Sequence, residues 1–249
     1  MPRSHSALPR LYVTAPLGPG AAVPLSAAQS HYLIDVMRFK KGSQAVVFNG
    51  RDGAWLAGLL TASRKAAELV PVEKIAEQTR PSDVWYFFAP LKSGRLDYLV
   101  QKATEMGAGH LQPVMTRHTQ VGRVNLDRLR ANVLEAAEQC EVLNLPAVHE
   151  PVDLGDVIAH WTENHLGRRL IFADEAAASG SPLETLRSLS GDKLGVIVGP
   201  EGGFSEEERA LLMAQKFVIP VSLGPRILRA DTAAVAALAV VQAAIGDWR

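Results

Sequence analysis

Residues 195–208, GVIVGPEGGFSEEE, combine a short apolar run, a glycine-rich turn and a helix start. The run is β-branched and too short for a helix, so it predicts a buried strand. The turn glycines allow positive φ and let a ligand approach the backbone. Ser205 followed by Glu208 is a capping box, which predicts that a helix begins here. Open α/β sheets bind ligands at such turns, although an ordinary strand-to-helix turn gives the same pattern.

The turn contains an acidic residue, Glu201, and no Lys follows it. The pattern of a phosphate-binding P-loop is therefore not met. A carboxylate in the turn favours a cationic or neutral ligand over a triphosphate.

Composition places the chain among ordinary globular proteins, with 47% hydrophobic residues, 21% charged residues and no net charge over 249 residues. No apolar run approaches the roughly 18 residues of a membrane span. The N-terminus lacks the apolar segment of a signal peptide. A single cysteine, Cys140, excludes an internal disulfide and is expected to be a small core residue. We therefore expect a cytoplasmic protein with neither a membrane contact nor a metal centre.

Charge is unevenly distributed. Residues 1–80 carry ten Lys and Arg against five Asp and Glu, which leaves an acidic excess in the rest of the chain. A basic N-terminal part is a weak indication of a polyanionic partner, and a mixed-charge solvated surface explains it equally well.

The chain divides into two patterns. Residues 1–75 contain several short strand patterns and one short helix at 29–37, which predicts a small β-barrel. Basic side chains cluster around its turns: Arg38, Lys40, Lys41, Arg51, Arg64 and Lys65. Residues 76–83, with Pro81, are the expected linker. In residues 84–249 strands alternate with helices, which predicts an α/β domain with a mostly parallel sheet.

Within the second domain, an apolar helical face at 96–106 is opposed by a polar one that includes Arg95 and Lys102. Such a face is usually only solvated. A helix is also expected at about 153–165. The strand at 170–173 ends at Asp174 and Glu175, which could bind a ligand hydroxyl or simply begin a loop.

The C-terminal segment holds a second informative turn, GPRILR at 224–229, in which two apolar residues lie between two arginines. Asp231 or Thr232 is expected to cap the Ala-rich helix that follows. This helix is apolar nearly all round, so it must be buried on more than one side, for which a subunit interface is a natural place.

Together these stretches resemble the RsmE family, bacterial SPOUT-class methyltransferases that modify N3 of a uridine in 16S ribosomal RNA. The resemblance rests on GPEGGFSEEE at 199–208, LGPRILR at 223–229, QKATEMGA at 101–108 and EAAEQ at 135–139. The segment 29–38, with Gly42 and FNG at 48–50, is similar to the PUA-like domain of the family.

The resemblance implies a SPOUT domain with a deep trefoil knot, although knotted chains are nearly absent among proteins. It implies S-adenosylmethionine as the cofactor and a homodimer as the active form. The small ribosomal subunit and its 16S rRNA are the implied partners. The implied cofactor residues come from three turns: Ile171, Phe172, Asp174, Gly199, Pro200, Glu201, Gly202, Leu223, Gly224, Ile227, Leu228, Arg229 and Thr232. The implied RNA contacts are Arg38, Lys40, Lys41, Arg51, Lys92, Arg95 and Lys102.

The expected chemistry is in-line methyl transfer with removal of the uracil N3 proton. Arg229 or Arg226 would stabilise the imide anion, and Glu201 or Asp231 is the candidate base. The chain departs from the family pattern at Asp231, where Glu is usual, at Val142, where Arg is usual, and at His118, where a small polar residue is usual. The alternatives are a SPOUT enzyme for another RNA site and a ribosome-binding protein of this fold without catalysis.

Overall fold

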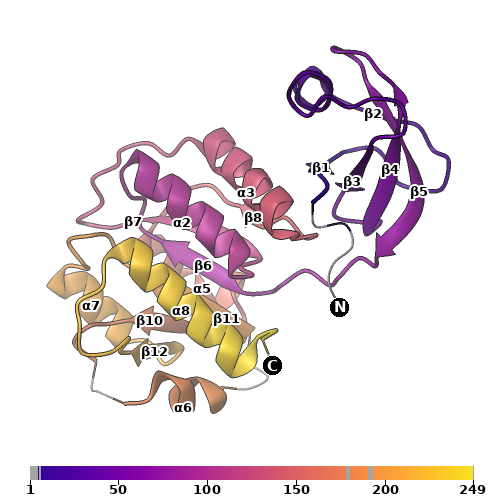
Figure 1. Cartoon of the computed structure of the whole chain (residues 1–249). Coiled ribbons are helices and arrows are strands. Elements are labelled where there is room, and N and C mark those ends of the chain that lie inside the picture. Colours follow the sequence, from indigo (N-terminus) through magenta and orange to yellow (C-terminus); the bar gives the residue numbers. More distant parts are fainter. Residues whose placement is uncertain (1–4, 6, 178–179, 190–192, 249) are drawn as a thin grey trace. The chain divides into compact units, whose positions relative to one another are not determined.

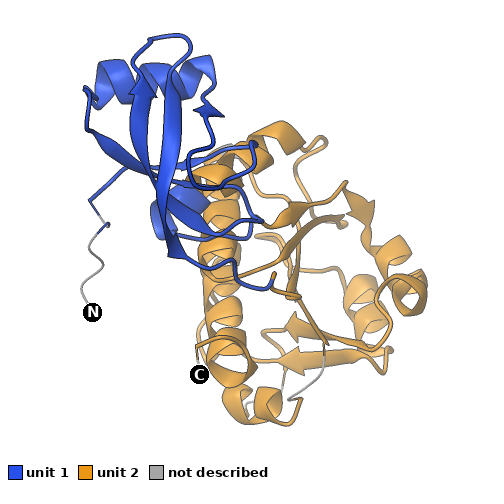
Figure 2. Cartoon of the chain, turned by 90° about the vertical axis from the view of Figure 1, so that its right-hand side faces the viewer, with its two compact units in different colours: residues 1–80, 137–145 blue, residues 81–136, 146–249 orange. Residues whose placement is uncertain are grey.

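The computed structural model describes residue 5 and residues 7–177, 180–189 and 193–248. The chain divides into two compact units, coloured separately in Figure 2. The first unit contains residues 1–80 together with 137–145, and the second contains residues 81–136 and 146–249. The sequence predicts a division at 1–75, 76–83 and 84–249, which does not include 137–145 in the first unit.

The first unit is built on a sheet with strand order β1-β3-β4-β5-β2 in the described residues (Figure 1). Its strands are β1 (Arg10–Tyr12), β2 (Val23–Pro24), β3 (Gln44–Phe48), β4 (Ala54–Thr61) and β5 (Glu68–Ala76). The β1–β3 pair is parallel and the other pairs are antiparallel. Apolar side chains such as Val23, Leu33 and Leu69 form one buried core in this unit. Because β2 has only two residues, it is too short to produce a recognisable strand pattern.

The helical segment expected at 29–37 has two parts. Helix α1 (Ala27–His31) begins at a capping box formed by Ser26 and Gln29. It continues into η1 (Tyr32–Val36), a single π-helical turn. Arg38 follows with φ of 55°, a left-handed conformation that non-glycine residues seldom adopt.

The segment 137–145 completes a second cluster of the first unit. Ala137 and Leu143 pack with Val46, Phe48 and Ala54. The Tyr12 N–H also donates to Glu138 Oε1 at 2.8 Å. Residues 137–145 therefore complete the packing of β3 and β4, although they are distant from these strands in the sequence.

The second unit is an α/β layer structure whose sheet has the order β12-β10-β11-β6-β7-β8 in the described residues, with β9 paired to β7. All of these pairs are parallel, as the alternating pattern predicted. The strands are β6 (Trp85–Phe88), β7 (His110–Met115), β8 (Ala147–Val148), β9 (Val152–Asp153), β10 (Arg168–Ala173), β11 (Lys193–Val198) and β12 (Val218–Val221).

Helices cover both faces of this sheet. On one face, α2 (Ser93–Glu105) and α8 (Ala230–Ile245) lie side by side (Figure 1). On the other face, α4 (Leu154–Ala159), α5 (Trp161–Asn164) and α7 (Glu206–Met213) contribute Leu154, Trp161 and Leu212 to a core that includes Phe87 and Phe172. The remaining helices are α3 (Leu126–Cys140) and α6 (Pro182–Arg187). No helix among the described residues is long and apolar enough to cross a membrane.

Three local expectations were wrong. Cys140, the last residue of α3, is exposed and not in the core. The helix expected at 153–165 is divided at His160, whose ψ of 14° is not helical. Helix α8 begins one residue before Asp231, with Arg229 in the extended N-cap conformation and without a side-chain cap.

Candidate functional site

A cavity of about 720 Å³ lies at the C-terminal ends of β10, β11 and β12. Three loops form most of its lining: 173–176 after β10, 199–204 after β11 and 223–229 after β12. This is the edge at which parallel sheets place ligands. The glycine-rich turn noted in the sequence forms part of the cavity wall, and the volume of the cavity suits an organic ligand.

The glycine-rich turn is held by its own backbone and by the helix cap. Gly203 has φ of +67° and donates its N–H to the Pro200 carbonyl at 2.9 Å. The capping box of Ser205 and Glu208 is confirmed at the start of α7. A Cβ on Gly199 would lie 2.9 Å from the ring of Phe204, so this position tolerates no side chain without movement of the ring. Glycine at this position therefore lets the Phe204 ring pack against the backbone of the turn.

Asp174 forms an ion pair that the sequence did not reveal. Its carboxylate is 5% exposed and accepts hydrogen bonds from Arg209 Nε at 3.2 Å and Nη2 at 2.8 Å. The Ala176 N–H also donates to Asp174 Oδ1. The carboxylate raises the pKa of Arg209 through this hydrogen bond and by its charge. Both residues line the cavity, so they add a fixed dipole to its wall.

Glu201 also has a cationic partner. Arg95, in the first turn of α2, donates from Nη1 to Glu201 Oε1 at 3.0 Å. Their side chains are 43% and 34% exposed, and both residues line the cavity. A pair this accessible exchanges partners readily, because water and salt screen it.

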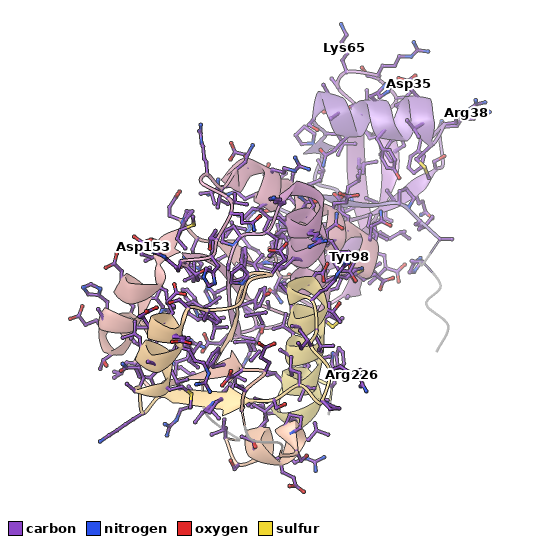
Figure 3. The ribbon with its side chains drawn as sticks, turned by 90° about the vertical axis from the view of Figure 1, so that its left-hand side faces the viewer. Asp35, Arg38, Lys65, Tyr98, Asp153 and Arg226 are labelled. Atoms are coloured by element: carbon purple, nitrogen blue, oxygen red, sulfur yellow. The ribbon has the colours of Figure 1, made fainter. Side chains whose placement is uncertain are left out.

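The third loop supplies both cationic and apolar groups. Arg226 and Arg229 line the cavity and are exposed (Arg226 is labelled in Figure 3). Between them, Ile227 is 84% exposed and Leu228 is partly buried. An exposed isoleucine at the rim of a cavity is available to cover an apolar ligand surface.

Three of the predicted residues do not line the cavity. Ile171 is buried on the opposite side of β10 from Phe172, because successive strand residues alternate between faces. The other two are Asp231 and Thr232, which lie in the first turn of α8. There, Asp231 accepts a hydrogen bond from the Thr232 N–H at 2.8 Å. The other predicted residues of the three turns line it: Phe172, Asp174, Gly199, Pro200, Glu201, Gly202, Leu223, Gly224, Arg226, Ile227, Leu228 and Arg229.

The predicted RNA contacts fall into two groups. Arg38, Lys40, Lys41 and Arg51 are exposed on the first unit, where Arg38 and Lys65 project into solvent (Figure 3). In the second unit, Lys92 and Arg95 are exposed at the start of α2.

Lys102, on the same helix, is partly buried and contacts both carboxylate oxygens of Glu105 at 2.7 Å.

Among the described residues, no group of three or more His, Cys, Asp or Glu side chains is arranged to hold a metal ion.

Two family models match the chain. The RNA methyltransferase domain covers residues 78–242, and the RNA methyltransferase PUA domain covers residues 25–72. The ribosomal RNA small subunit methyltransferase E of Rickettsia conorii is 32% identical, over 94% of each chain. The corresponding protein of Synechocystis is 34% identical, over 90% of this chain and 73% of its own.

A solved structure gives the same result at the level of the fold. The ribosomal RNA small subunit methyltransferase E of Neisseria gonorrhoeae, bound to S-adenosylmethionine, superposes with a TM-score of 0.85. It is 26% identical to this chain, and the match covers 97% of this chain and all of the other. The chain belongs to the family of ribosomal RNA small subunit methyltransferase E, with an α/β methyltransferase domain and a PUA domain.

Proposed function

We propose that this protein transfers a methyl group from S-adenosylmethionine to N3 of a uridine in 16S ribosomal RNA, within the small ribosomal subunit. The observation that carries this proposal is the cavity at the ends of β10, β11 and β12, which presents glycine backbone, apolar side chains and arginines together. Membership of the methyltransferase family supports the same reaction class.

The residues of the cavity fit the proposed cofactor. The backbone of Gly199 and Gly202, which lines the cavity, would offer hydrogen-bonding groups to the ring nitrogens of an adenine. Leu223 and Leu228 would provide apolar cover, and the carboxylates of Glu201 and Asp174, paired with Arg95 and Arg209, would provide hydrogen-bond acceptors. When bound, the cofactor supplies a methyl group that its sulfonium has already activated.

The remaining chemistry is assigned to side chains of the third loop and the glycine turn. Arg226 and Arg229 would stabilise the anion of the uracil ring, since both line the cavity. Glu201 is a better candidate than Asp231 for the proton acceptor, because only Glu201 lines the cavity. Thr232, for the same reason, is a weaker candidate for cofactor contact than the residues before it.

We propose that the first unit is a PUA-like barrel that binds RNA through Arg38, Lys40, Lys41 and Arg51. Lys92, Arg95 and Lys102 would extend the RNA contact on the methyltransferase domain. We further propose that the C-terminal part of the chain passes through a trefoil knot and that two copies form a cytoplasmic homodimer.

A methyl-transfer assay tests the reaction. Labelled S-adenosylmethionine is incubated with unmodified 30S subunits or naked 16S rRNA, and the RNA is digested for nucleoside analysis. We expect 3-methyluridine, formed more efficiently on the subunit. A different methylated nucleoside would keep the enzyme class and overturn the specificity. Cofactor binding without any transfer would favour a ribosome-binding protein of this fold.

A further inference from the structure

The loop after β7 forms a tight turn against the glycine-rich turn. Thr116 and Thr119 close it, because the Thr116 N–H donates to Thr119 Oγ1 and the Thr119 N–H to the Thr116 carbonyl, both at 3.0 Å. The N–H of Arg117 donates to Glu208 Oε1 at 2.7 Å, while Glu208 Oε2 accepts from the Ser205 N–H at 2.8 Å. One carboxylate thus joins this loop to the helix cap that follows the glycines.

His118 stands at the centre of this contact. Its Nδ1 lies 3.0 Å from the carbonyl oxygen of Gly202 and 3.1 Å from that of Gly203. A Cβ built on Gly202 would lie 3.3 Å from the His118 Cβ, so the imidazole packs directly against the turn. His118 itself does not line the cavity, whereas Gly202 and Gly203 do.

Carbonyl oxygens only accept hydrogen bonds, so the ring must donate from Nδ1 in both contacts. A neutral His118 is therefore the Nδ1–H tautomer. The Gly202 carbonyl and the Gly203 N–H belong to the same trans peptide, in which the two groups point in opposite directions. Since the carbonyl points toward His118, the Gly203 N–H points away from it. That N–H indeed reaches the Pro200 carbonyl at 2.9 Å. In the next peptide the Gly203 carbonyl points toward His118, so the Phe204 N–H points away from it.

We propose that His118 is a positioning residue for the cofactor cavity. Its Nδ1–H holds two carbonyls of the glycine turn on the side away from the cavity and so sets the orientation of the peptides that line it. The effect on the cofactor rests on the proposed function, whereas the orientation of the turn rests on the contacts of His118 alone.

Three substitutions at one position separate donation from packing. In His118→Asn, the side-chain amide nitrogen would occupy the place of Nδ1 and still donate, so the affinity for S-adenosylmethionine should stay within about twofold. His118→Ala removes the donor and lets the free turn leave its binding orientation, so the dissociation constant should rise by about 3- to 10-fold, with the loss of one hydrogen bond as the upper limit. His118→Asp places an acceptor against two carbonyls and should bind more weakly still. The kcat at saturating cofactor should stay within about twofold in His118→Ala.

Titration calorimetry on the full-length protein measures these constants. The matched control is His160→Ala, since the His160 Nδ1 also contacts a carbonyl, that of Asp156 at 3.0 Å, outside the cavity lining. This control should bind as the wild type does. Equal weakening by His118→Asn and His118→Ala, or wild-type affinity in His118→Asp, would overturn the proposal.

A second measurement needs no cofactor. Nitrogen chemical shifts of labelled histidine should show the Nδ1–H tautomer for His118 at high pH. Amide exchange at Gly203 should be several-fold faster in His118→Ala than in His118→Asn. An Nε2–H tautomer, or equal exchange in the two variants, would refute the positioning role. If the wild type failed to bind S-adenosylmethionine, the proposed function would fail, and these two readouts would still decide the role of His118.

Discussion

At the scale of single residues, Glu201 is an accessible acid of the cavity with a cationic partner. It is paired with Arg95 at 3.0 Å, and both side chains are more than a third exposed. If Glu201 accepts the N3 proton, Glu201→Gln should lower kcat at saturating cofactor about 100-fold, a much larger effect than its effect on cofactor affinity. Arg95→Met should raise the RNA KM with little effect on kcat. Steady-state kinetics with separate cofactor titration measure both effects. A wild-type kcat in Glu201→Gln would rule out Glu201 as the base.

Tyr86 illustrates a different residue-level effect, on stability. It is 0% exposed, and its hydroxyl has no hydrogen-bond partner among the described residues. Burial raises its pKa, and the Asp231 carboxylate adds to the shift. Removing an unpaired buried hydroxyl breaks no hydrogen bond, so Tyr86→Phe should leave the free energy of unfolding unchanged or raise it by up to about 1 kcal/mol.

Urea unfolding measures this change. Tyr86→Ala serves as the contrast, because loss of a buried aromatic ring destabilises by about 3 kcal/mol or more. A marked destabilisation in Tyr86→Phe would show that the hydroxyl has a partner, such as a buried water.

The same scale shows where sequence reasoning succeeds and where it stops. The glycine turn and its helix cap are predictable, because Gly203 and the Ser205–Glu208 pair are local signals. The Asp174–Arg209 pair joins residues 35 positions apart, and no local pattern links them. His118 stands out in the sequence only as an unusual residue, since its partner Gly202 lies 84 positions away.

At the scale of secondary-structure elements, an aromatic cluster surrounds Trp85 at the start of β6 in the second unit. The ring of Trp85 stacks on His110 at 4.2 Å and on His149 at 4.5 Å, and His165 meets it edge-on. Burial lowers the pKa of His165 to about 4, helped by the positive charge of Arg168. Burial also lowers the pKa of His110 and of His149.

This cluster predicts an acid-sensitive fold. His165 stays neutral in the native state down to about pH 4, whereas an unfolded histidine takes up a proton near pH 6.5. Below pH 6.5 the unfolded chain therefore binds more protons, and this contribution to stability falls until about pH 4. We expect the urea midpoint to fall between about pH 7 and about pH 4.5, and to fall less in His165→Phe.

Element boundaries are less predictable than element types. The composition of α8 indicates a helix, but its first residue is set by the extended backbone of Arg229, which has no side-chain signature. The break at His160 also lacks a Gly or Pro to mark it. The amphipathic pattern of α3 is continuous, so it could not reveal that its last residues pack in the first unit.

At the scale of the whole molecule, the proposed dimer needs an apolar surface. Helix α8 has an inward face of buried residues such as Leu238 and Val241, while Val240 is only partly covered and Ala243 is exposed. Val240→Glu should convert a dimer to a monomer and reduce turnover, because a charge would be buried in the interface. Light scattering over a range of concentrations measures the mass.

Ala210→Glu, at an exposed position of α7, is the matched control and should leave the mass unchanged. Circular dichroism checks that both variants fold. A wild-type protein that remains monomeric at high concentration would contradict the dimer.

The inclusion of residues 137–145 in the first unit has a consequence for biosynthesis and for evolution. A nascent chain that has released only its first 80 residues still lacks Ala137 and Leu143, which pack with Phe48. The N-terminal unit therefore cannot finish folding before a large part of the catalytic domain has been translated. A gene fusion that transferred only the first 80 codons would produce a first unit without Ala137 and Leu143, and the residues that pack with them would be left uncovered. Transfer of the intact first unit to another protein therefore requires two separate stretches of the gene.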